Sequence, residues 1–237
     1  MTSTSLTLLL TAYLMQLQPP PPPGAVMVHD RYWETVQSAA DVIEEIGSIP
    51  EKSIPASLLR DAQGIAIIPN VIKVGFVLSG RYGRGVVVMR DQNGLWGNPV
   101  FITLAGGNLG PQIGAQATDV VLVFKTRRSV DGFLKGQKFT LGADAGIAAG
   151  PLGREAEAST DPKIQAEIYS YSRSRGLFAG LSLGGTVLDV DYAANAAFYQ
   201  RRNITPAVIV AGNNLPVPVV VVRLRTTLDK QERPLQK

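Results

Sequence analysis

Residues 64–89 read GIAIIPNVIKVGFVLSGRYGRGVVVM, so that short β-branched apolar runs alternate with glycine. The same pattern continues along the chain, and 21 of its 24 glycines lie between Gly64 and Gly185. Glycine weakens helices and supplies the positive-φ positions and close approaches that turns and bulges need. The middle of the chain is therefore predicted to be a compact, turn-dense β structure.

Hydrophobic periodicity predicts strands through this region and helices on either side of it. The predicted strands lie near residues 65–69, 72–79, 85–90, 95–104, 120–126, 137–141, 165–175 and 178–190. The segment Asp91-Gln-Asn-Gly94 is a turn signal between two of them. The predicted helices cover residues 30–47, 53–62, 129–135 and 191–202. This order predicts an α+β fold, with a curved, mainly antiparallel β-sheet or barrel and flanking helices at both ends.

The two ends of the chain are predicted to lie outside the domain. Residues 6–17 are an apolar run of 12, which is too short to span a membrane and resembles the core of a secretory signal. Residues 19–23 are five prolines, which favour a polyproline II spacer. We therefore expect a leader and spacer over 1–24, a domain over 25–202 and a tail over 203–237.

The leader and the tail carry further expectations. A signal-like leader predicts a secreted, periplasmic or envelope-associated bacterial protein; without export, a peripheral membrane protein of the cytoplasm is expected. In the tail, Val217-Pro-Val-Val-Val-Val222 is predicted to add an edge strand, because a sheet tolerates proline only at its edge.

Composition excludes most catalytic and metal centres. The chain has no cysteine, one histidine (His29) and a net charge of +4. Thiol nucleophiles, disulfides and zinc–thiolate sites are excluded, and the charge is too low for a dedicated nucleic-acid-binding protein. Gly80-Arg-Tyr-Gly-Arg-Gly85 lacks the Walker spacing and is predicted to be a β-turn with two exposed arginines. Gly106-Gly-Asn-Leu-Gly-Pro111 could hold an anion in a backbone nest or could simply connect two strands.

One acidic residue stands alone in an apolar segment. Asp144 lies in Gly142-Ala-Asp-Ala-Gly146, and a buried aspartate must be hydrogen-bonded or have a shifted pKa. The simpler interpretation is a structural aspartate bonded to turn amides. The alternative is a functional acid, with a hydrolase centred on Asp144 and Arg154.

Basic residues are concentrated between Arg60 and Lys138. Ten basic and four acidic residues give this segment a charge of +6, against +4 for the whole chain. Such residues attract anionic lipid at about 1 kcal/mol each, or they form an ordinary solvated rim. The candidate lipid-binding residues are Lys73, Arg81, Arg84, Lys125, Arg127, Arg128, Lys135 and Lys138.

A series of short motifs resembles one known family. The motifs are Gly64-Ile-Ala-Ile-Ile-Pro69, Lys73-Val-Gly-Phe76, Gly80-Arg-Tyr-Gly-Arg-Gly85, Trp96-Gly-Asn-Pro99, Gly110-Pro-Gln-Ile-Gly-Ala-Gln116, Thr118-Asp-Val-Val-Leu-Val123, Leu141-Gly-Ala-Asp-Ala145, Ala149-Gly-Pro-Leu-Gly-Arg154, Tyr171-Ser-Arg-Ser-Arg-Gly-Leu-Phe-Ala-Gly180 and Ala194-Asn195. In this order they are similar to the SYLF family of lipid-binding domains, also described as actin-binding. With the preceding helices, the resemblance covers roughly three quarters of the chain.

The resemblance implies a non-enzymatic function. It implies binding to membranes that contain phosphoinositides or other anionic phospholipids, with no catalytic activity, cofactor or metal, and some eukaryotic relatives also bind actin filaments. The chain departs from the family in its N-terminal helix, whose exposed face is acidic and is expected to be repelled by anionic lipid: Asp30, Glu34, Asp41, Glu44 and Glu45. We therefore expect lipid binding through a basic rim. The alternative is a protein-interaction scaffold, such as a binder of actin-like filaments.

Overall fold

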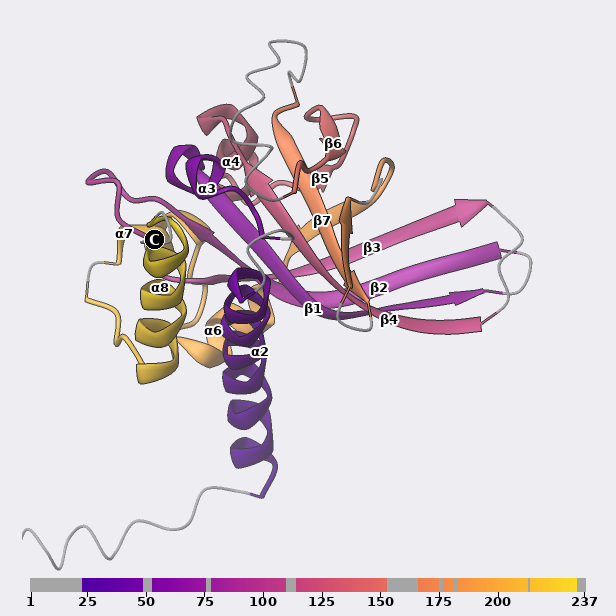
Figure 1. The fold of residues 1–237 in the computed structure, drawn as a ribbon. Helices are drawn as coiled ribbons and strands as arrows, with labels where there is room; N and C mark the ends of the chain where they lie inside the picture. The colour runs from indigo at the N-terminus through magenta and orange to yellow at the C-terminus, as the bar shows by residue number, and fades with distance from the viewer. Residues whose placement is uncertain are drawn as a thin grey trace, which may run out of the picture.

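The computed structural model describes residues 23–48, 53–75, 78–109, 114–152, 166–174, 177–180, 183–212 and 214–233 (Figure 1). Most of the predicted leader and spacer lies outside these residues. Pro23 and Gly24, which were assigned to the spacer, begin a helix instead.

One sheet organises the described part of the chain. Its strands are β1 (Gly64–Gly75), β2 (Leu78–Met89), β3 (Val100–Leu109), β4 (Gly114–Phe124), β5 (Phe139–Thr140), β6 (Ile147–Ala149), β7 (Ile168–Ser174), β8 (Leu177–Gly180) and β9 (Val187–Val190). They are ordered β5-β9-β3-β2-β1-β4-β7-β6, with β8 paired to β7. Only β6 and β7 are parallel. The predicted α+β fold with a curved, mainly antiparallel sheet is confirmed.

The long strands β1–β4 have a covered half and an open half. Ile65 and Ile67 point to one face of β1 and Ala66 and Ile68 to the other, and all four are fully buried. Further along the same strand, Ile72 is exposed. Figure 1 shows the far ends of β1–β4 extending beyond the helices.

A β-bulge joins two of the predicted strands into one. The segments 65–69 and 72–79 were expected to be separate, but β1 runs through both, and its register shifts between Ile68 and Val71. Pro69 cannot donate to the ladder, and Asn70 adopts a positive φ of 51°. The Asn70 N–H donates instead to Asp119 Oδ1 at 2.9 Å. The bulge therefore satisfies the backbone where the regular ladder is interrupted.

Several other strand assignments need correction. The predicted turn at Gly80–Gly85 lies inside β2, which pairs with β1 and β3 along both edges. The predicted strand 95–104 begins only at Val100, because residues 90–99 form a turn closed by an Arg90–Trp96 bridge. The predicted strand 178–190 is two strands, β8 and β9.

Six helices flank the sheet in the described residues. They are α2 (Pro23–Gly47), α3 (Ala56–Asp61), α4 (Arg127–Leu134), α6 (Tyr192–Phe198), α7 (Pro206–Ala211) and α8 (Val219–Gln231). The helix predicted over residues 30–47 begins earlier, at Pro23. Val36, Ala40 and Ile43 are buried and recur at the spacing of one helical face.

The predicted edge strand over 217–222 is wrong. Pro218 is the N-cap of α8, where its missing N–H leaves no hydrogen bond unmade. Val220, Val221, Leu224 and Leu228 are buried at helical spacing, and α8 lies beside α2 (Figure 1). Packing on α2 thus overrides the β preference of four consecutive valines.

Candidate functional site

The predicted basic rim divides into two groups. Lys73, Arg81 and Arg84 lie on β1 and β2. The second group, named here the α4 basic segment, follows β4 and comprises Lys125, Arg127, Arg128, Lys135 and Lys138. Gly64, at the start of β1, pairs with Phe124, which directly precedes the α4 basic segment. Lys73 lies nine residues further along β1 and pairs with Gln116. The two groups are therefore about 30 Å apart along the strand and do not form one continuous surface.

The first group is itself split between the two faces of the sheet. Lys73 and Arg81 are cross-strand partners, and Ile72 and Tyr82 form the next pair. Because side chains alternate along a strand, Lys73 and Arg81 point away from the face that carries Ile72 and Tyr82. Arg84 follows Tyr82 by two residues and shares its face. Partial burial lowers the pKa of Arg81.

Ile72, Tyr82 and Arg84, together with Arg31 of α2, form a surface that we name the Tyr82 face. These side chains help to line a hollow of about 310 Å³ between α2 and the bulge of β1. Ile72 is 53% exposed and Tyr82 is 48% exposed, which is unusual for large side chains in central strands. Arg84 Nε donates to the Tyr82 hydroxyl at 3.2 Å, and this bond raises the pKa of Arg84. The tyrosine and the arginine therefore hold each other in place.

The α4 basic segment is exposed and partly paired. Arg127 contacts Asp131 at 3.6 Å, one helical turn away, and Lys138 contacts Asp189 at 3.4 Å. Lys125 Nζ lies 5.6 Å from the centre of the Tyr169 ring. Among the described residues, neither Lys125, Arg128 nor Lys135 forms an ion pair with a carboxylate. The segment therefore keeps net positive charge.

The acidic face of α2 is used inside the molecule. Asp41 and Glu44 contact Arg223 of α8 at 2.7 and 2.8 Å. Glu45 contacts Arg173 of β7, which also contacts Asp119 at 3.2 Å. Three of the five carboxylates expected to face anionic lipid are thus partly neutralised by neighbouring arginines.

The other candidate centres have structural explanations. Asp144 is exposed rather than buried, and its carboxylate accepts from the Thr140 N–H at 2.6 Å, as expected for an aspartate that caps a turn. Arg154, its predicted partner in a hydrolase, lies outside the described residues. Gly106 and Gly107 pair with β2 as part of β3, so this half of the predicted anion nest is strand; Gly110 and Pro111 are not described.

Two further kinds of site, a metal centre and a membrane-spanning helix, have no candidate among the described residues. They contain no cluster of three or more side chains suited to a metal ion. Within the same ranges, every helix is too short or too polar to cross a membrane.

The C-terminal helix contributes contacts that the sequence did not suggest. Glu232 accepts from Arg90 Nη2 at 2.7 Å and from Trp96 Nε1 at 2.5 Å, and the Arg90 guanidinium lies 4.1 Å from the Trp96 ring centre. Arg225 Nε donates to the Gly97 carbonyl at 2.9 Å. The Trp96-Gly-Asn-Pro99 motif therefore anchors α8. No local signal in the tail pointed to this role.

Residues 105–231, which are 127 of the 237 residues, match the family model described as "Ysc84: Las17-binding protein actin regulator". LAS seventeen-binding protein 3 of Saccharomyces cerevisiae is 39% identical over 172 residues, covering 72% of this chain and 37% of that protein. SH3 domain-containing YSC84-like protein 1 is 38% identical over 181 residues in Xenopus laevis and 39% identical over 168 residues in Homo sapiens. These two alignments cover 74% and 69% of this chain, and 54% and 49% of the relatives.

The chain thus spans about a third to a half of the length of these relatives. The family description and the name of the yeast relative describe binding proteins, and the region that the family model matches runs from β3 through α8. The motifs quoted from the sequence extend from β1 to α6, so they begin before the region that the family model matches. More than half of the chain matches the family model, so this chain belongs to the Ysc84 family, the SYLF family of Las17-binding actin regulators.

Proposed function

We propose that this chain is a non-catalytic module that binds a protein partner of the actin machinery, and that the Tyr82 face is its contact surface. The family description, which names an actin regulator, supports a role in actin regulation, and the name of the yeast relative describes a protein that binds another protein. Because the relatives are about twice as long or longer, the actin filament as partner is itself part of the proposal.

The observation that carries the proposal is the exposure of Ile72 and Tyr82 beside two arginines. Interfaces concentrate their binding energy in a few tyrosine, tryptophan and arginine side chains set among apolar contacts. Tyr82 and Arg84 fit this description, because their mutual hydrogen bond reduces the side-chain entropy that binding would cost.

The charges around the hollow indicate the kind of partner. Arg31 and Arg84 face a single carboxylate, Glu34, among the residues that line it. The net positive lining favours a partner with an acidic surface.

Co-sedimentation with actin filaments in the absence of lipid tests the proposal. The double variant Tyr82→Ala, Arg84→Ala is expected to weaken filament binding by about 30-fold, because two such side chains together contribute about 2 kcal/mol. The matched control is Tyr192→Ala, a tyrosine of α6 with the same 48% exposure. The control should bind as the unaltered chain does. Failure of the unaltered chain to sediment with filaments, or equal binding by the double variant, would contradict the proposal.

A second function, binding to anionic phospholipid or phosphoinositide membranes, is favoured by the α4 basic segment. Lys125, Arg128 and Lys135 are exposed, and within the described chain no carboxylate pairs with them. Basic residues near an anionic bilayer contribute about 1 kcal/mol each. This candidate uses a different end of β1 from the Tyr82 face, so the two functions can be tested separately.

Vesicles containing phosphatidylserine test the second function. The double reversal Lys125→Glu, Arg128→Glu is expected to weaken vesicle binding by about 30-fold or more, because it removes two favourable charges of about 1 kcal/mol each and adds two repulsive ones. The control, Arg201→Glu, Arg202→Glu, makes the same charge change on exposed residues after α6. Binding should also fall as salt rises. Equal effects of the two double variants would show that net charge, and not the α4 basic segment, is responsible.

A further inference from the structure

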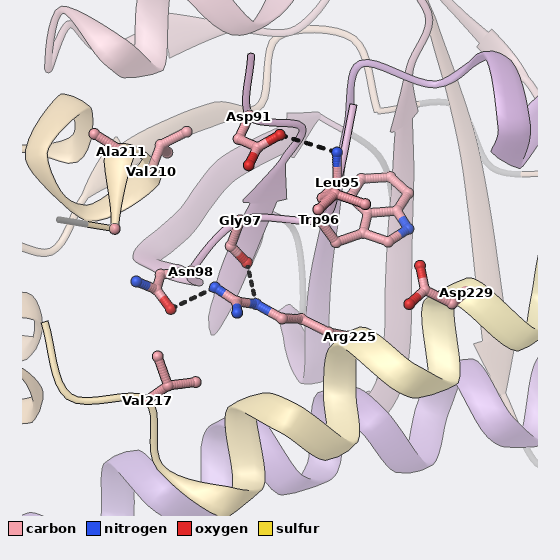
Figure 2. A pocket seen from close by; sticks show the side chains of 11 residues that line it. Asp91, Leu95, Trp96, Gly97, Asn98, Val210, Ala211, Val217, Arg225 and Asp229 are labelled. Carbon is pink, nitrogen blue, oxygen red and sulfur yellow. Dashed lines mark hydrogen bonds between the residues drawn. The ribbon is translucent and has the colours of Figure 1, made fainter. Parts of the chain in front are cut away.

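A second hollow lies between the β2–β3 turn, α7 and α8. Figure 2 shows this hollow, which we name the Asn98 pocket and whose volume is about 350 Å³. Trp96 and Asn98 come from the turn, Val210 from α7 and Arg225 from α8. The pocket is therefore assembled by the same contacts that anchor the C-terminal helix.

Asn98 carries a buried donor that no described residue satisfies. The side chain is 1% exposed, and its Oδ1 accepts from Arg225 Nη2 at 2.6 Å (Figure 2). A guanidinium has only donors, so the amide oxygen must face Arg225 and the amide nitrogen must point the other way. Nδ2 has no hydrogen-bond partner in the described part of the chain. An unsatisfied buried donor is costly, which makes an acceptor at this position favourable.

Apolar side chains and carboxylates also line the pocket. Leu95 is 63% exposed and Val217 is 44% exposed, and both line the pocket. Asp91 accepts from the N–H groups of Asn93 and Leu95, and it is therefore committed to the turn. Asp229 is exposed on α8 and also lines the pocket.

The charge balance selects a neutral acceptor over an anion. Arg225 contributes one positive charge to the lining, while Asp91 and Asp229 contribute two negative charges. A phosphate or carboxylate would therefore meet net repulsion, whereas a peptide carbonyl would not. The exposed carboxylate of Asp229 additionally suits a basic side chain beside that carbonyl.

We propose that the Asn98 pocket binds an extended peptide segment of a protein partner. A main-chain carbonyl of the segment accepts from Asn98 Nδ2, an aliphatic side chain packs on Leu95 and Val217, and a basic side chain lies near Asp229. This goes beyond the proposed function, because the pocket shares no lining residue with the hollow of the Tyr82 face. Either surface could therefore fail its test without affecting the other.

The test is an NMR titration of the full chain with blocked pentapeptides. The probe is acetyl-Gly-Val-Gly-Lys-Gly-amide, and its counterpart carries Glu in place of Lys. The Asn98 side-chain NH2 and Trp96 indole resonances are expected to shift saturably with the Lys peptide. The Glu peptide should bind about fivefold more weakly, as expected for one exposed charge pair. No shift, equal affinity for both peptides, or tighter binding of inorganic phosphate would each overturn the proposal.

Variants of the pocket residues distinguish an effect on peptide binding from an effect on folding. Leu95→Ser and Asp229→Lys change exposed side chains, so the chain should stay folded while Lys-peptide binding weakens. Asn98→Asp keeps an oxygen facing Arg225 but removes the donor, and it should weaken binding by about tenfold, the value of one hydrogen bond. Unchanged affinity in Leu95→Ser and Asp229→Lys would overturn the proposal even if Asn98→Asp failed to fold.

Discussion

Replacing Gly85 with alanine is expected to destabilise the chain by about 3 kcal/mol or more, the upper range for inserting a methyl group into a packed site. A Cβ at this position would lie 2.2 Å from the Ile67 carbonyl oxygen and 2.7 Å from Ile68 Cα. Both are backbone atoms of β1, the central strand, so they cannot move without disrupting its pairing with β2 and β4. Urea unfolding followed by circular dichroism measures the loss.

Gly80 in the same strand provides the matched control. A Cβ added there would meet nothing within 4 Å, and its φ lies outside the positive range that alanine avoids. Gly80→Ala should therefore change the unfolding free energy by no more than about 0.5 kcal/mol. If both variants lost the same stability, the close approach at Gly85 would not be the cause of the loss.

The glycine pattern of residues 64–89 predicted a β structure, but it could not predict how β1 and β2 pair. The sequence suggested a break at Pro69-Asn70 and a turn at Gly80–Gly85. In the structure, Asp119 of β4 accepts the Asn70 N–H, so the chain continues as one strand. A partner 49 residues away made this possible, and local pattern carries no information about it.

The candidate site was predicted only in part, for the same reason. The basic residues were identified from composition, but their faces depend on cross-strand register, and the bulge at Asn70 shifts that register by one residue. Within β2, alternation along the strand places Arg84 on the face of Tyr82 and Arg81 on the opposite face. This placement was missed because the glycine pattern predicts a turn over this part of β2. Lys73 of β1 shares the face of Arg81 through the observed pairing of the two strands.

In the tail, local sequence signals predict the wrong secondary structure. Four valines favour a strand, yet Val220, Val221 and Leu224 are buried in a helix that packs on α2. Arg225 and Glu232 could be assigned no role until that helix was placed against the Trp96 turn. The hydrogen bonds that the turn forms with Arg225 and with Glu232 therefore became visible only with the tertiary structure.

Asn195→Leu is expected to cost about 3 kcal/mol, although the two side chains have similar volumes. Asn195 is fully buried in α6, and its Oδ1 accepts from the Phe101 N–H at 2.9 Å. Its Nδ2 donates to the carbonyls of Phe101 at 3.1 Å and Asp191 at 2.8 Å. The side chain thereby continues the β3–β9 ladder beyond its last pair, Ile102 with Val190. Thermal and urea unfolding of the variant measure the loss.

The expected loss of stability comes from leaving the buried Phe101 N–H without a hydrogen-bond acceptor, and not from a cavity. Leucine fills the space but leaves the buried Phe101 N–H without an acceptor, and an orphaned donor of this kind costs about 1–3 kcal/mol before the lost donor bonds are added. Asn93→Leu is the control, because Asn93 is exposed in the β2–β3 turn and should change stability by less than about 0.5 kcal/mol. A loss in Asn195→Leu no larger than in Asn93→Leu would mean that Phe101 finds another acceptor. The hydrogen bond from the Phe101 N–H would then not explain why Asn195 is needed in the Ala194-Asn195 motif.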